Sequence, residues 1–582
     1  MENKKVILSV KDLHVKFRVR GRILTAIRGI SLDFHEGESI AIVGESGSGK
    51  SVFTKTFAGM LDGNGFIDNG SIIFHDEELA DTPVKLDAIA KFIVTAAIKK
   101  LNKYSKLENG SDIYKAILEL KREKKARESL SAEETQQLTE TINELSFQRT
   151  ELFNQRQTVD RKMEKARYKQ IGLEIKAMDK QIEDLRKQEK IAAKAHKKAA
   201  KNDTEYKAAY KNQMAELKKL YAEAQLQPVT EEQKSRNVVI AKEIYLSVGR
   251  YGFARRLLLI LKLMKAVKKA MRLGVDLNNE DLRNQVFDEV VFRVKYLEET
   301  GERLHGKCVL NLATIKYGKD WTKIRGGKIA TVFQDPMTSL NPIITIGKQI
   351  TSVIMQHQDC TELEARARAL ELMKKVGIPN AENRFDDYPF QYSGGMRQRI
   401  VIAIALSCQP KILICDEPTT ALDVTIQAQI LKLIKDLQKE FGYTIVFITH
   451  DLGVVANIAD RVAVLYAGQV IELGTVEDVF YDPRHPYTWA LLSSLPQLAQ
   501  RNTVLYSITG TPPSLYNKIV GDAFAPRNPY CLKVDTLAEP PMFQISETHF
   551  AKTWLEDPRA PKVEKPEIIQ NIHEKLMNAF NI

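Results

Sequence analysis

The chain is poor in cysteine and lacks long hydrophobic runs. Its 582 residues include five cysteines, and none of them stand at the spacings of a metal site or a disulfide framework. No stretch approaches the ~18 uninterrupted apolar residues that a membrane-spanning helix needs. The lysines near the N-terminus are not followed by the apolar segment of a signal peptide. We therefore expect a protein of a reducing compartment that does not cross a membrane by itself.

Proline and glycine are almost absent from one long part of the chain, Lys85 to Leu226, which is rich in Lys, Glu, Gln and Ala. Positive charge gathers in the same region. The formal net charge is +12, and by count roughly +15 lies between Ala80 and Trp321 and roughly −3 in the rest. The composition predicts a basic helical segment, and a solvated helical surface is the simplest reason for its charge. The length predicts roughly three to four domains.

A heptad pattern inside this segment predicts packed helices. Apolar residues alternate at spacings of four and three over about two and a half heptads, and Glu164 and Glu189 break the register. This predicts a short helical hairpin or bundle rather than a long coiled coil. Further helices are predicted for Leu257 to Leu273, which is basic and very apolar, and for Val286 to Leu304. The heptad positions are Ile171, Ile175, Met178, Ile182 and Leu185.

The most specific pattern is G-x-x-x-x-G-K-[ST], the phosphate-binding loop, at residues 44–51. Ser39 to Val43 predicts a buried strand leading into it, and Val52 to Met60 predicts the helix that follows. The glycines let backbone N–H groups turn towards phosphate oxygens, and the helix N-terminus adds partial positive charge. We expect Lys50 to reach the β- and γ-phosphates and Ser51 to offer its hydroxyl to Mg²⁺. The predicted nucleotide-binding residues of the loop are Gly44, Glu45, Ser46, Gly47, Ser48, Gly49, Lys50 and Ser51.

Alternating segments before and after the loop predict strands. Val6 to Val19 and Leu24 to Phe34 predict a small antiparallel sheet, and Gly70 to Phe74 predicts one more strand. Phe17 is a candidate platform for an adenine ring, which stacks on aromatic faces. The alternative is that Phe17 is a core aromatic.

A buried strand from Lys411 to Glu417 ends in two carboxylates. Sites of parallel sheets lie at the carboxyl ends of the strands, so we expect Asp416 to hold Mg²⁺ through water and Glu417 to polarise the attacking water. Thr444 to Thr449 predicts a further buried strand that ends at His450. A lone histidine is usually structural, but here the surrounding motifs favour a hydrogen bond to a γ-phosphate.

Two more segments belong to the same constellation. Gly327 to Phe333 predicts a strand that ends at Gln334, and a later helix is predicted from a capping box at Thr361 to Gly377. Tyr392 to Arg399 then brings two glycines to the start of an apolar helix, Ile400 to Leu406, where backbone N–H groups can approach a phosphate.

The C-terminal part changes character. Arg461 to Leu473 predicts two short strands around Gly468, and from Tyr481 onward the chain is rich in proline and loops. We interpret this last part as an appended regulatory or docking segment.

These motifs resemble those of the ATP-binding subunits of ABC transporters. Ser393-Gly394-Gly395 matches the family's signature, Gln334 its Q-loop, Asp423 its D-loop and His450 its switch histidine. A closer resemblance, to the oligopeptide/dipeptide permease subfamily, covers residues 1 to about 79 and about 322 to 540. The segments that carry it are Phe333 to Pro342, Tyr392 to Arg399, Asp416 to Val424 and His485-Pro486-Tyr487.

The resemblance implies an α/β fold, an ABC-type P-loop ATPase with a RecA-like lobe, an antiparallel β subdomain and a helical signature subdomain. To this the chain adds a large all-α insertion and a loop-rich C-terminal extension. We expect the nucleotide-binding domain at residues 1–79 and 322–478, with its helical subdomain at about 337–410. The insertion is expected at residues 80–321 and the extension at residues 479–582.

Roles for single residues follow from the same resemblance. The implied catalytic residues are Glu417, His450 and Gln334, and the implied Mg²⁺ ligands are Ser51, Gln334 and Asp416. The implied signature residues, which would face the ATP of a partner subunit, are Ser393, Gly394, Gly395 and Met396, with Asp423 as the D-loop residue.

The family's assembly is also implied. ATP and Mg²⁺ would bind at the interface with a second ATPase subunit in a heterodimer, and closure would drive two transmembrane permease subunits between inward- and outward-facing states. A peptide-binding lipoprotein would deliver the cargo. The chain would lie at the cytoplasmic face of the cell membrane, associated through the permease, and no nucleic acid is expected as a partner.

Two departures from the family pattern matter. Some members bind an iron–sulfur cluster through cysteines of the C-terminal segment, but here residues 521–531 keep only Cys531, so no iron–sulfur cluster is expected. The second departure is the insertion between the phosphate loop and Gln334.

Other functions stay open at this stage. An ABC-type ATPase with helical hairpins can be a DNA-repair or chromosome-structure protein, but in that class the helices interrupt the chain between the Q-loop and the signature. Here Gln334 to Ser393 is of ordinary length. Dipeptide, nickel and antimicrobial-peptide importers remain alternatives to an oligopeptide importer, because an ATPase subunit does not touch the cargo.

We expect the insertion to be an autonomous helical module outside the ATP site. Its two ends must meet, because the strands that flank it have to stay neighbours to keep Gln334 near the phosphates. A solvated spacer or a clamp on the partner ATPase is one interpretation. Contact of the helix Leu257 to Leu273 with anionic lipid headgroups is another.

Overall fold

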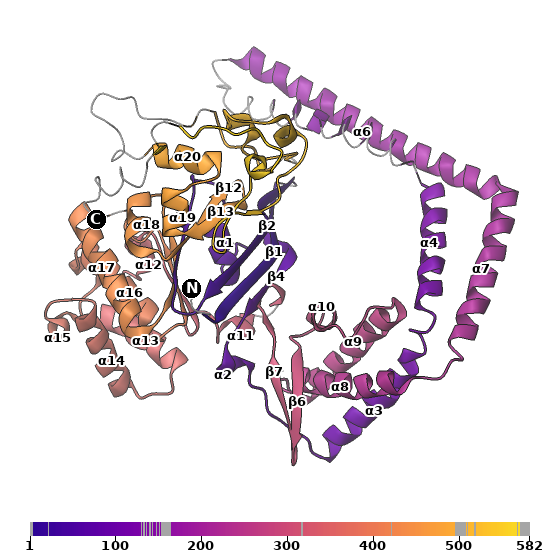
Figure 1. Cartoon of the computed structure of the whole chain (residues 1–582), viewed down its shortest axis with the longest axis horizontal. Coiled ribbons are helices and arrows are strands. Elements are labelled where there is room, and N and C mark those ends of the chain that lie inside the picture. Colours follow the sequence, from indigo (N-terminus) through magenta and orange to yellow (C-terminus); the bar gives the residue numbers. More distant parts are fainter. Residues whose placement is uncertain are drawn as a thin grey trace. The chain divides into compact units, whose positions relative to one another are not determined.

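The computed structural model describes residues 4–20, 22–129, 164–315, 318–420, 422–494, 510–516, 519–566 and 569–570, with Ile508 and scattered residues between 131 and 152. The chain divides into two compact units, Met1–Asp81 with Cys308–Ile582, and Thr82–Lys307 (Figure 1). The second unit is inserted into the first. It begins close to the expected Ala80, but the chain returns to the first unit at Cys308 rather than near Trp321.

A small antiparallel sheet opens the first unit, as the alternating patterns predicted. Its strand order is β2-β1-β4-β8. Side chains on one face, such as Leu13, Val15 and Ile30, are fully buried, because alternate residues of a strand point to the same side. The strands are β1 (Val6–Val19), β2 (Arg22–His35), β4 (Gly65–Phe74) and β8 (Leu310–Asn311).

The main sheet has eight strands in the order β14-β15-β13-β12-β3-β11-β10-β9. The five from β12 to β9 run parallel to their neighbours, and they are continuous apolar runs because both faces of the sheet are covered. The C-terminal extension supplies β14 and β15, so it is built into this sheet. The strands are β3 (Ser39–Val43), β9 (Ile329–Val332), β10 (Ile412–Asp416), β11 (Thr444–Ile448), β12 (Arg461–Tyr466), β13 (Gln469–Thr475), β14 (Phe543–Gln544) and β15 (Phe550–Ala551).

Helices gather beside this sheet (Figure 1). A group of them forms the predicted helical subdomain around a core in which Ile346, Ile350 and Ile354 are fully buried. The predicted capping box is confirmed, since Thr361 accepts from the Glu364 backbone and Glu364 from that of Thr361. The helices are α1 (Lys50–Phe57), α2 (Glu77–Ala80), α11 (Gly318–Trp321), α12 (Pro336–Ser339), α13 (Ile346–His357), α14 (Glu362–Lys375), α15 (Ala381–Arg384), α16 (Gly394–Leu406), α17 (Val424–Phe441), α18 (Leu452–Ile458), α19 (Val476–Tyr481) and α20 (Pro486–Ser493).

The second unit is mainly helical, as predicted, but it is not all-α. It also contains a three-stranded sheet of order β5-β7-β6. The strands are β5 (Val84–Lys85), β6 (Val294–Thr300) and β7 (Arg303–Cys308). The helices are α3 (Ala88–Ser105), α4 (Ser111–Arg127), α6 (Lys165–Asn202), α7 (Thr204–Ala224), α8 (Glu231–Val248), α9 (Phe253–Arg272) and α10 (Glu280–Asp288).

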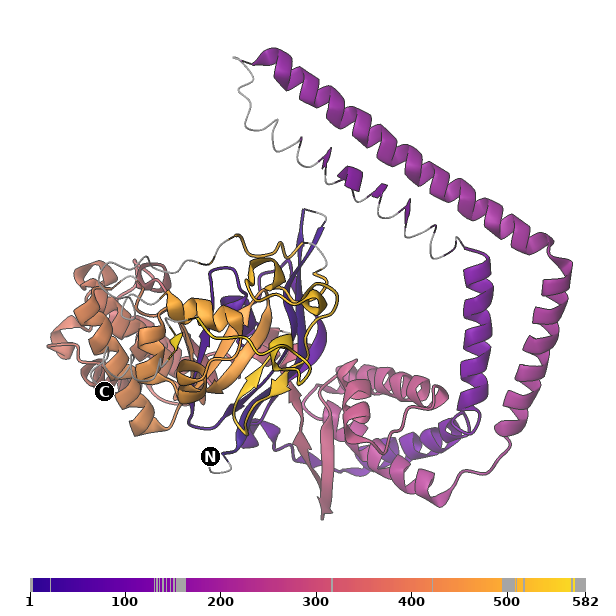
Figure 2. The same cartoon turned by 45° about the horizontal axis from the view of Figure 1, so that its top comes forward.

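Two predictions for the second unit are wrong. The helix expected from Val286 to Leu304 is the end of α10 followed by the hairpin β6–β7, whose turn is closed by Gly301 at a φ of +60°. The heptad positions lie in one helix, α6, which continues past Glu189 and has 38 residues in all (Figure 2), so this element is longer than the predicted short hairpin or bundle. A charged residue at one seam position weakens side-chain packing but leaves the helical backbone intact.

The two ends of the insertion meet, as expected. In the first unit β4 pairs with β8 in antiparallel register, Phe74 opposite Leu310. In the second, the backbone N–H of Thr82 donates to the carbonyl of Gly306 over 3.0 Å. Across the described parts of the chain, no helix has the length and hydrophobicity to span a bilayer.

Candidate active site

The predicted motif residues meet at one edge of the main sheet. The neighbouring parallel strands β9, β10, β11 and β3 run directly into Gln334, Asp416 with Glu417, His450 and the phosphate loop, respectively. Because parallel strands end at the same edge, residues from four distant parts of the sequence come together there.

The phosphate loop is shaped by glycines in left-handed conformations. Gly44, Gly47 and Gly49 have φ angles of +150°, +81° and +102°. A Cβ on Gly44 would lie 2.2 Å from the carbonyl oxygen of Leu465, so only glycine fits there. The loop also holds the hydroxyl of Ser48, which is buried and has no hydrogen-bond partner among the described residues. Such an orphan donor fits a phosphate oxygen.

Lys50 is held inside this loop. Its ammonium donates to the carbonyl oxygens of Gly44 (2.8 Å) and Glu45 (3.0 Å), and the residue is 6% exposed. Burial lowers the pKa of Lys50, and the carboxylates of Glu417 and Asp416 oppose this shift. A buried cation whose hydrogen bonds go to neutral carbonyls gains a stronger partner when phosphate binds.

Ser51 and Asp416 form a pair of oxygen ligands beside Lys50. The Ser51 hydroxyl donates to Oδ1 of Asp416 over 3.0 Å. Burial raises the pKa of Asp416, and the hydrogen bond from Ser51 partly offsets this. A divalent cation at this position would favour the ionised carboxylate, and these hard oxygen donors suit Mg²⁺.

The carboxylate of Glu417 contacts the other two predicted catalytic side chains, Gln334 and His450. Its Oε2 accepts hydrogen bonds from Nε2 of Gln334 (2.9 Å) and from the hydroxyl of Thr420 (3.1 Å). Its Oε1 lies 3.4 Å from Nδ1 of His450. Glu417 has a φ of +47°, an uncommon conformation for a residue other than glycine. Gln334 and His450 therefore both reach the carboxylate proposed to act on water, and Thr420 is an additional contact that sequence reasoning did not assign to the site.

Phe17 offers little free ring surface for adenine. The residue is 8% exposed, and its ring lies so close to Gly65 that a Cβ there would be 2.7 Å from its Cε1. The geometry favours the core-aromatic alternative, and stacking on adenine stays a prediction.

The signature residues lie at the N-terminus of α16, which is open to solvent at this point. Ser393 caps the helix by accepting from the backbone of Met396 over 3.4 Å, and no atom outside its immediate neighbours lies within 4 Å of a Cβ placed on Gly394. Gly395 lies against Ile426 of α17, just after Asp423, which is exposed and caps α17 with its backbone. Within the described residues, no hydrogen bond joins this helix end to the phosphate loop.

The C-terminal extension contacts the phosphate loop directly. The backbone N–H of Glu45 donates to the hydroxyl of Tyr487 over 2.8 Å. The guanidinium of Arg527 donates to both carboxylate oxygens of Glu45, at 2.8 and 3.1 Å, and to the hydroxyl of Tyr466 at 3.2 Å. The rings of Tyr466, Tyr487 and Phe524 pack together at centroid distances of 4.6 to 5.4 Å. Sequence reasoning singled out His485-Pro486-Tyr487 but did not connect it, or Arg527, to the ATP site.

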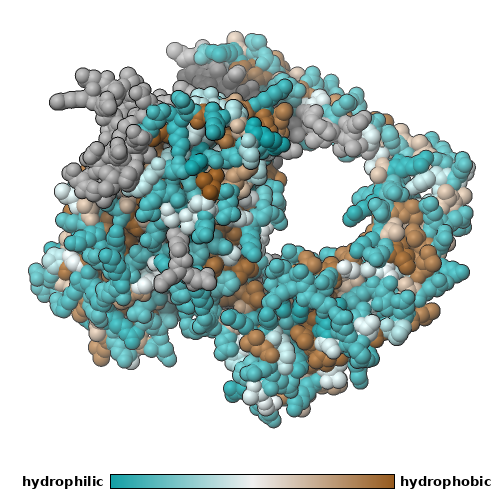
Figure 3. Space-filling view, viewed as in Figure 1, coloured by the Kyte–Doolittle hydropathy of each residue, from teal (hydrophilic) through white to brown (hydrophobic). Residues whose placement is uncertain are grey.

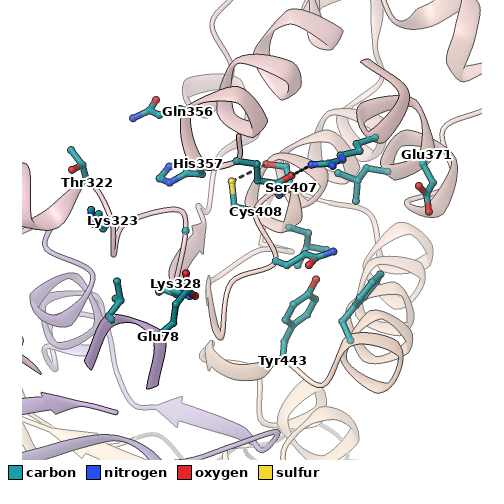
Figure 4. Close-up of a pocket in the computed structure, with 18 of the residues that line it drawn as sticks. Glu78, Thr322, Lys323, Lys328, Gln356, His357, Glu371, Ser407, Cys408 and Tyr443 are labelled. Carbon is teal, nitrogen blue, oxygen red and sulfur yellow. Dashed lines mark hydrogen bonds and ion pairs between the residues drawn. The ribbon is translucent and has the colours of Figure 1, made fainter. Parts of the chain in front are cut away.

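A pocket of about 1070 Å³ lies at the opposite edge of the main sheet (Figure 4). Lys328, Gln409 and Tyr443 line it, and each of them precedes the start of a parallel strand. Its wall also includes Cys408, whose thiol lies 3.6 Å from the carbonyl oxygen of Val353. None of the predicted ATP-site residues line it, so this pocket is separate from the motifs.

The sequences of known proteins are similar to this chain in the ATPase region and in the C-terminal extension. The family model described as "ABC transporter" matches residues 27–227 and 295–420, and that described as "Oligopeptide/dipeptide transporter, C-terminal region" matches residues 471–534. The oligopeptide transport ATP-binding protein AmiE of Streptococcus pneumoniae is 63% identical over 283 residues, 48% of this chain and 80% of that protein. The oligopeptide transport ATP-binding protein OppD of Bacillus subtilis is 58% identical over 263 residues, 45% of this chain and 74% of that protein.

Two further similarities complete the comparison. The dipeptide transport ATP-binding protein DppD of Lactococcus lactis is 59% identical over 254 residues, 44% of this chain and 72% of that protein. Among solved structures, a dimeric ATP-binding cassette in a post-hydrolysis state with ADP and Pi has 15% identity and a TM-score of 0.36, covering 81% of this chain and 98% of that one. The match to the family model and the coverage of AmiE show that the chain belongs to the ABC transporter family, as an ATP-binding subunit of the oligopeptide transport type whose ATPase domain is interrupted by an insertion.

Proposed function

We propose that this chain binds and hydrolyses ATP to power the import of oligopeptides through an ABC transporter. The observation that carries the proposal is the meeting of the phosphate loop, Asp416 and Glu417 at one sheet edge, with Gln334 and His450 on the Glu417 carboxylate. The oligopeptide assignment rests on the C-terminal match at residues 471–534 and on relatives that carry this function in their names.

Each side chain has a definite task in this mechanism. Lys50 and the N–H groups of the loop bind the β- and γ-phosphates. Ser51, Asp416 and Gln334 would hold Mg²⁺, which would supply positive charge to neutralise the transferred phosphoryl group. Gln334 donates to Glu417 through Nε2, which leaves its Oε1 available as a ligand. The Glu417 carboxylate would orient water and accept its proton.

The exposed signature predicts a second ATPase subunit. Ser393 and Gly394 expose a helix N-terminus to solvent, and a helix N-terminus attracts phosphate. In a heterodimer, Ser393, Gly394, Gly395 and Met396 would complete the ATP site of the partner, with Asp423 at the interface.

Apolar side chains on the helical subdomain offer a surface for the permease. Met337 is 62% exposed, Ile343 80% and Phe390 71%, and the rings of Tyr388 and Phe390 stack at 5.9 Å. Exposed apolar patches of this kind mark protein interfaces. Two transmembrane permease subunits are the proposed partners, together with a peptide-binding lipoprotein, and they would hold the chain at the cytoplasmic face of the membrane.

The second candidate function is dipeptide import, because the dipeptide transport protein of Lactococcus lactis is as similar to this chain as OppD of Bacillus subtilis is. Uptake of labelled peptides of two to six residues by cells with and without the gene would separate the two candidates. Loss of dipeptide uptake alone would overturn the oligopeptide assignment.

The catalytic proposal is tested with Glu417→Gln. The amide keeps the shape of the side chain but cannot accept a proton, so we expect ATP binding to persist and steady hydrolysis to fall by ~10²–10⁴-fold. Nucleotide titration and phosphate release measure the two quantities.

Glu298→Gln, an exposed glutamate of β6 in the second unit, serves as the matched control and should hydrolyse ATP as the parent does. Hydrolysis by Glu417→Gln at the parent rate would show that Glu417 is not the base.

A further inference from the structure

The N-terminal half of α9 (Phe253–Arg272) is apolar on both of its sides. One side packs into the second unit, with Leu259, Ile260 and Leu263 buried. The other side faces outward, although a helix that is apolar all round is normally covered all round. Figure 3 shows hydrophobic patches among hydrophilic residues on the surface. The exposed apolar residues of α9 and their exposed fractions are Phe253 60%, Leu257 38%, Leu258 52% and Leu261 63%.

The surroundings of this patch are strongly basic. Residues 249–275 contain Arg250, Arg255, Arg256, Lys262, Lys265, Lys268, Lys269 and Arg272 and no Asp or Glu. Leu258, Leu261, Lys262 and Lys265 recur at spacings of three and four, so they share one face of the helix. Within the described residues, no ion pair engages Lys262 or Lys265. The outer face of α9 thus runs from exposed leucines to free ammonium groups within two turns.

The inner face of α9 holds this surface firmly in place. Leu263, Val267 and Met271 are fully buried. From the first turn of α9, the guanidinium of Arg256 donates back to the carbonyl oxygens of Gly249 (2.8 Å) and Tyr251 (3.3 Å), which precede the helix. The exposed residues are therefore presented by a fixed helix, and their exposure does not result from a poorly packed core.

We propose that α9 is a membrane-surface helix whose outer leucines enter the headgroup region of an anionic bilayer while Lys262 and Lys265 contact lipid phosphates. A cationic amphipathic face with bulky apolar residues fits that environment. Because residues 249–275 carry only positive charges, this segment is complementary in charge to an anionic lipid surface. Nucleic acid would also attract the lysines, but it offers no place to bury Leu258 and Leu261. This contact belongs to the insertion and adds to any attachment through a permease.

The test measures the binding of the full-length protein to vesicles. We expect the protein to sediment with vesicles of phosphatidylglycerol and phosphatidylcholine at low salt, and to stay in solution with phosphatidylcholine alone. Raising the salt to about 1 M, where the screening length falls to about 3 Å, should weaken binding. Leu258→Glu with Leu261→Glu removes two apolar contacts and adds two negative charges, so the partition coefficient should fall about tenfold or more.

A matched control carries the same charge change elsewhere in the second unit. Leu173→Glu with Ile191→Glu alters two residues of α6 that are 68% and 67% exposed, and it should bind vesicles within about twofold of the parent. All three proteins should hydrolyse ATP equally, and equal helical content by circular dichroism should show that the second unit is folded in each of them. A parent that ignores anionic vesicles at low salt would overturn the proposal, as would equal losses in the two double variants. Binding of duplex DNA in place of vesicles would identify a nucleic-acid surface and equally overturn it.

Discussion

Glu45, a single residue of the phosphate loop, joins the ATP site to the C-terminal extension. Its backbone N–H is fixed by Tyr487, and its carboxylate is fixed by Arg527. The Arg527 side chain is 4% exposed, and its hydrogen bonds to Glu45 raise its pKa above the usual value. A two-pronged bond to a nearly buried guanidinium sets both the position and the orientation of the carboxylate. The extension is therefore part of the frame that shapes the loop.

Arg527→Met should weaken ATP binding, because it frees the loop while keeping a side chain of similar length. We expect a roughly tenfold rise in the dissociation constant, a coupling of ordinary size for contacting residues. Isothermal titration with ATP measures it. Arg559→Met removes a guanidinium that is 85% exposed and pairs with Asp557, and it should leave ATP affinity unchanged.

The double variant Glu45→Gln with Arg527→Met distinguishes direct coupling from general damage. If Arg527 acts through Glu45, the double variant should bind ATP about as well as the weaker single variant. Additive losses would show that Arg527 supports the fold independently of the loop.

His485 makes the extension sensitive to acid. Its Nδ1 accepts a hydrogen bond from the backbone of Tyr487 over 3.0 Å, so the neutral ring carries its proton on Nε2. Burial lowers the pKa of His485 from 6.5 to about 3. Below pH 6.5 the imidazole of His485 becomes protonated in the unfolded chain but stays neutral in the folded chain. Stability is then lost towards pH 3 by up to ~1.4 kcal/mol per pH unit, and above pH 6.5 this dependence vanishes.

The variant His485→Asn keeps a side-chain acceptor for the cap but cannot titrate. Urea unfolding at a series of pH values should show the parent losing stability faster than the variant between about pH 6.5 and 4. Asp522, whose burial raises its pKa to about 6, acts in the opposite sense, but it is present in both proteins. Parallel curves would show that His485 is not the acid-sensitive group.

The positions of site residues could be predicted from the sequence where the residue lies at the end of a strand. Asp416, Glu417 and His450 follow apolar strands of a parallel sheet, so their shared edge could be predicted from the strand pattern alone. The contact of Arg527 with Glu45 spans 482 positions, and it depends on the path of an irregular segment that carries no periodic pattern. For Phe17, the alternating pattern of Val6 to Val19 predicts a strand, but it does not say which face of that strand is covered by other elements. The burial of Phe17 therefore could not be predicted.

At the scale of elements, the errors came from competing periodicities. The segment around Val294 contains enough apolar residues to resemble a helix, but Val294 and Tyr296 point inward while Lys295 and Leu297 are exposed, which is the period of a strand. The two-residue turn at Gly301 then returns the chain as β7. In α6 the broken heptad pattern indicated a short hairpin or bundle, but the helix continues past Glu189 because no proline or glycine stops it there.

The hairpin β6–β7 is held to α8 by a buried ion pair. Glu243 of α8 accepts hydrogen bonds from Nη2 of Arg293 over 2.7 Å and from Nε over 3.2 Å, and both side chains are 1% exposed. Glu243→Leu should destabilise the second unit by about 3–5 kcal/mol, because it leaves the guanidinium buried without its carboxylate. Thermal unfolding followed by circular dichroism measures the loss.

Glu231→Leu is the control at the start of the same helix. That glutamate is 87% exposed and pairs only weakly, as a surface ion pair, with Lys234. A loss for Glu243→Leu as small as that of the control would show that the buried pair does not hold α8 to the hairpin.

At the scale of the whole molecule, two units share one chain but not one composition. The basic charge belongs to the inserted segment, whereas the ATPase motifs all lie in Met1–Asp81 and Cys308–Ile582. Sequence reasoning predicted this division from composition and from the family resemblance, but it placed the return of the chain too late. The signal it missed is Leu310–Asn311, a two-residue strand too short to show any period. The expected absence of an iron–sulfur cluster stays a prediction.

The ATPase unit should fold and work without the insertion. Its sheet already brings the cut ends together, since β4 and β8 are paired neighbours, and the side-chain oxygen of Asn311 accepts from the backbone of Ile72 over 3.0 Å. Replacing residues 82–307 by a short Gly/Ser linker shortens the loop between these strands, and closing a shorter loop is entropically easier. We expect the shortened protein to bind ATP with an affinity within roughly threefold of the parent, because no predicted ATP-site residue is removed.

The same protein should lose vesicle binding, since α9 is gone. Nucleotide titration and vesicle sedimentation on one preparation read both properties, and a folded, ATP-binding protein that still sediments with anionic vesicles would place the lipid contact outside the insertion. Failure of the shortened chain to bind ATP would show that the insertion is part of the ATPase fold.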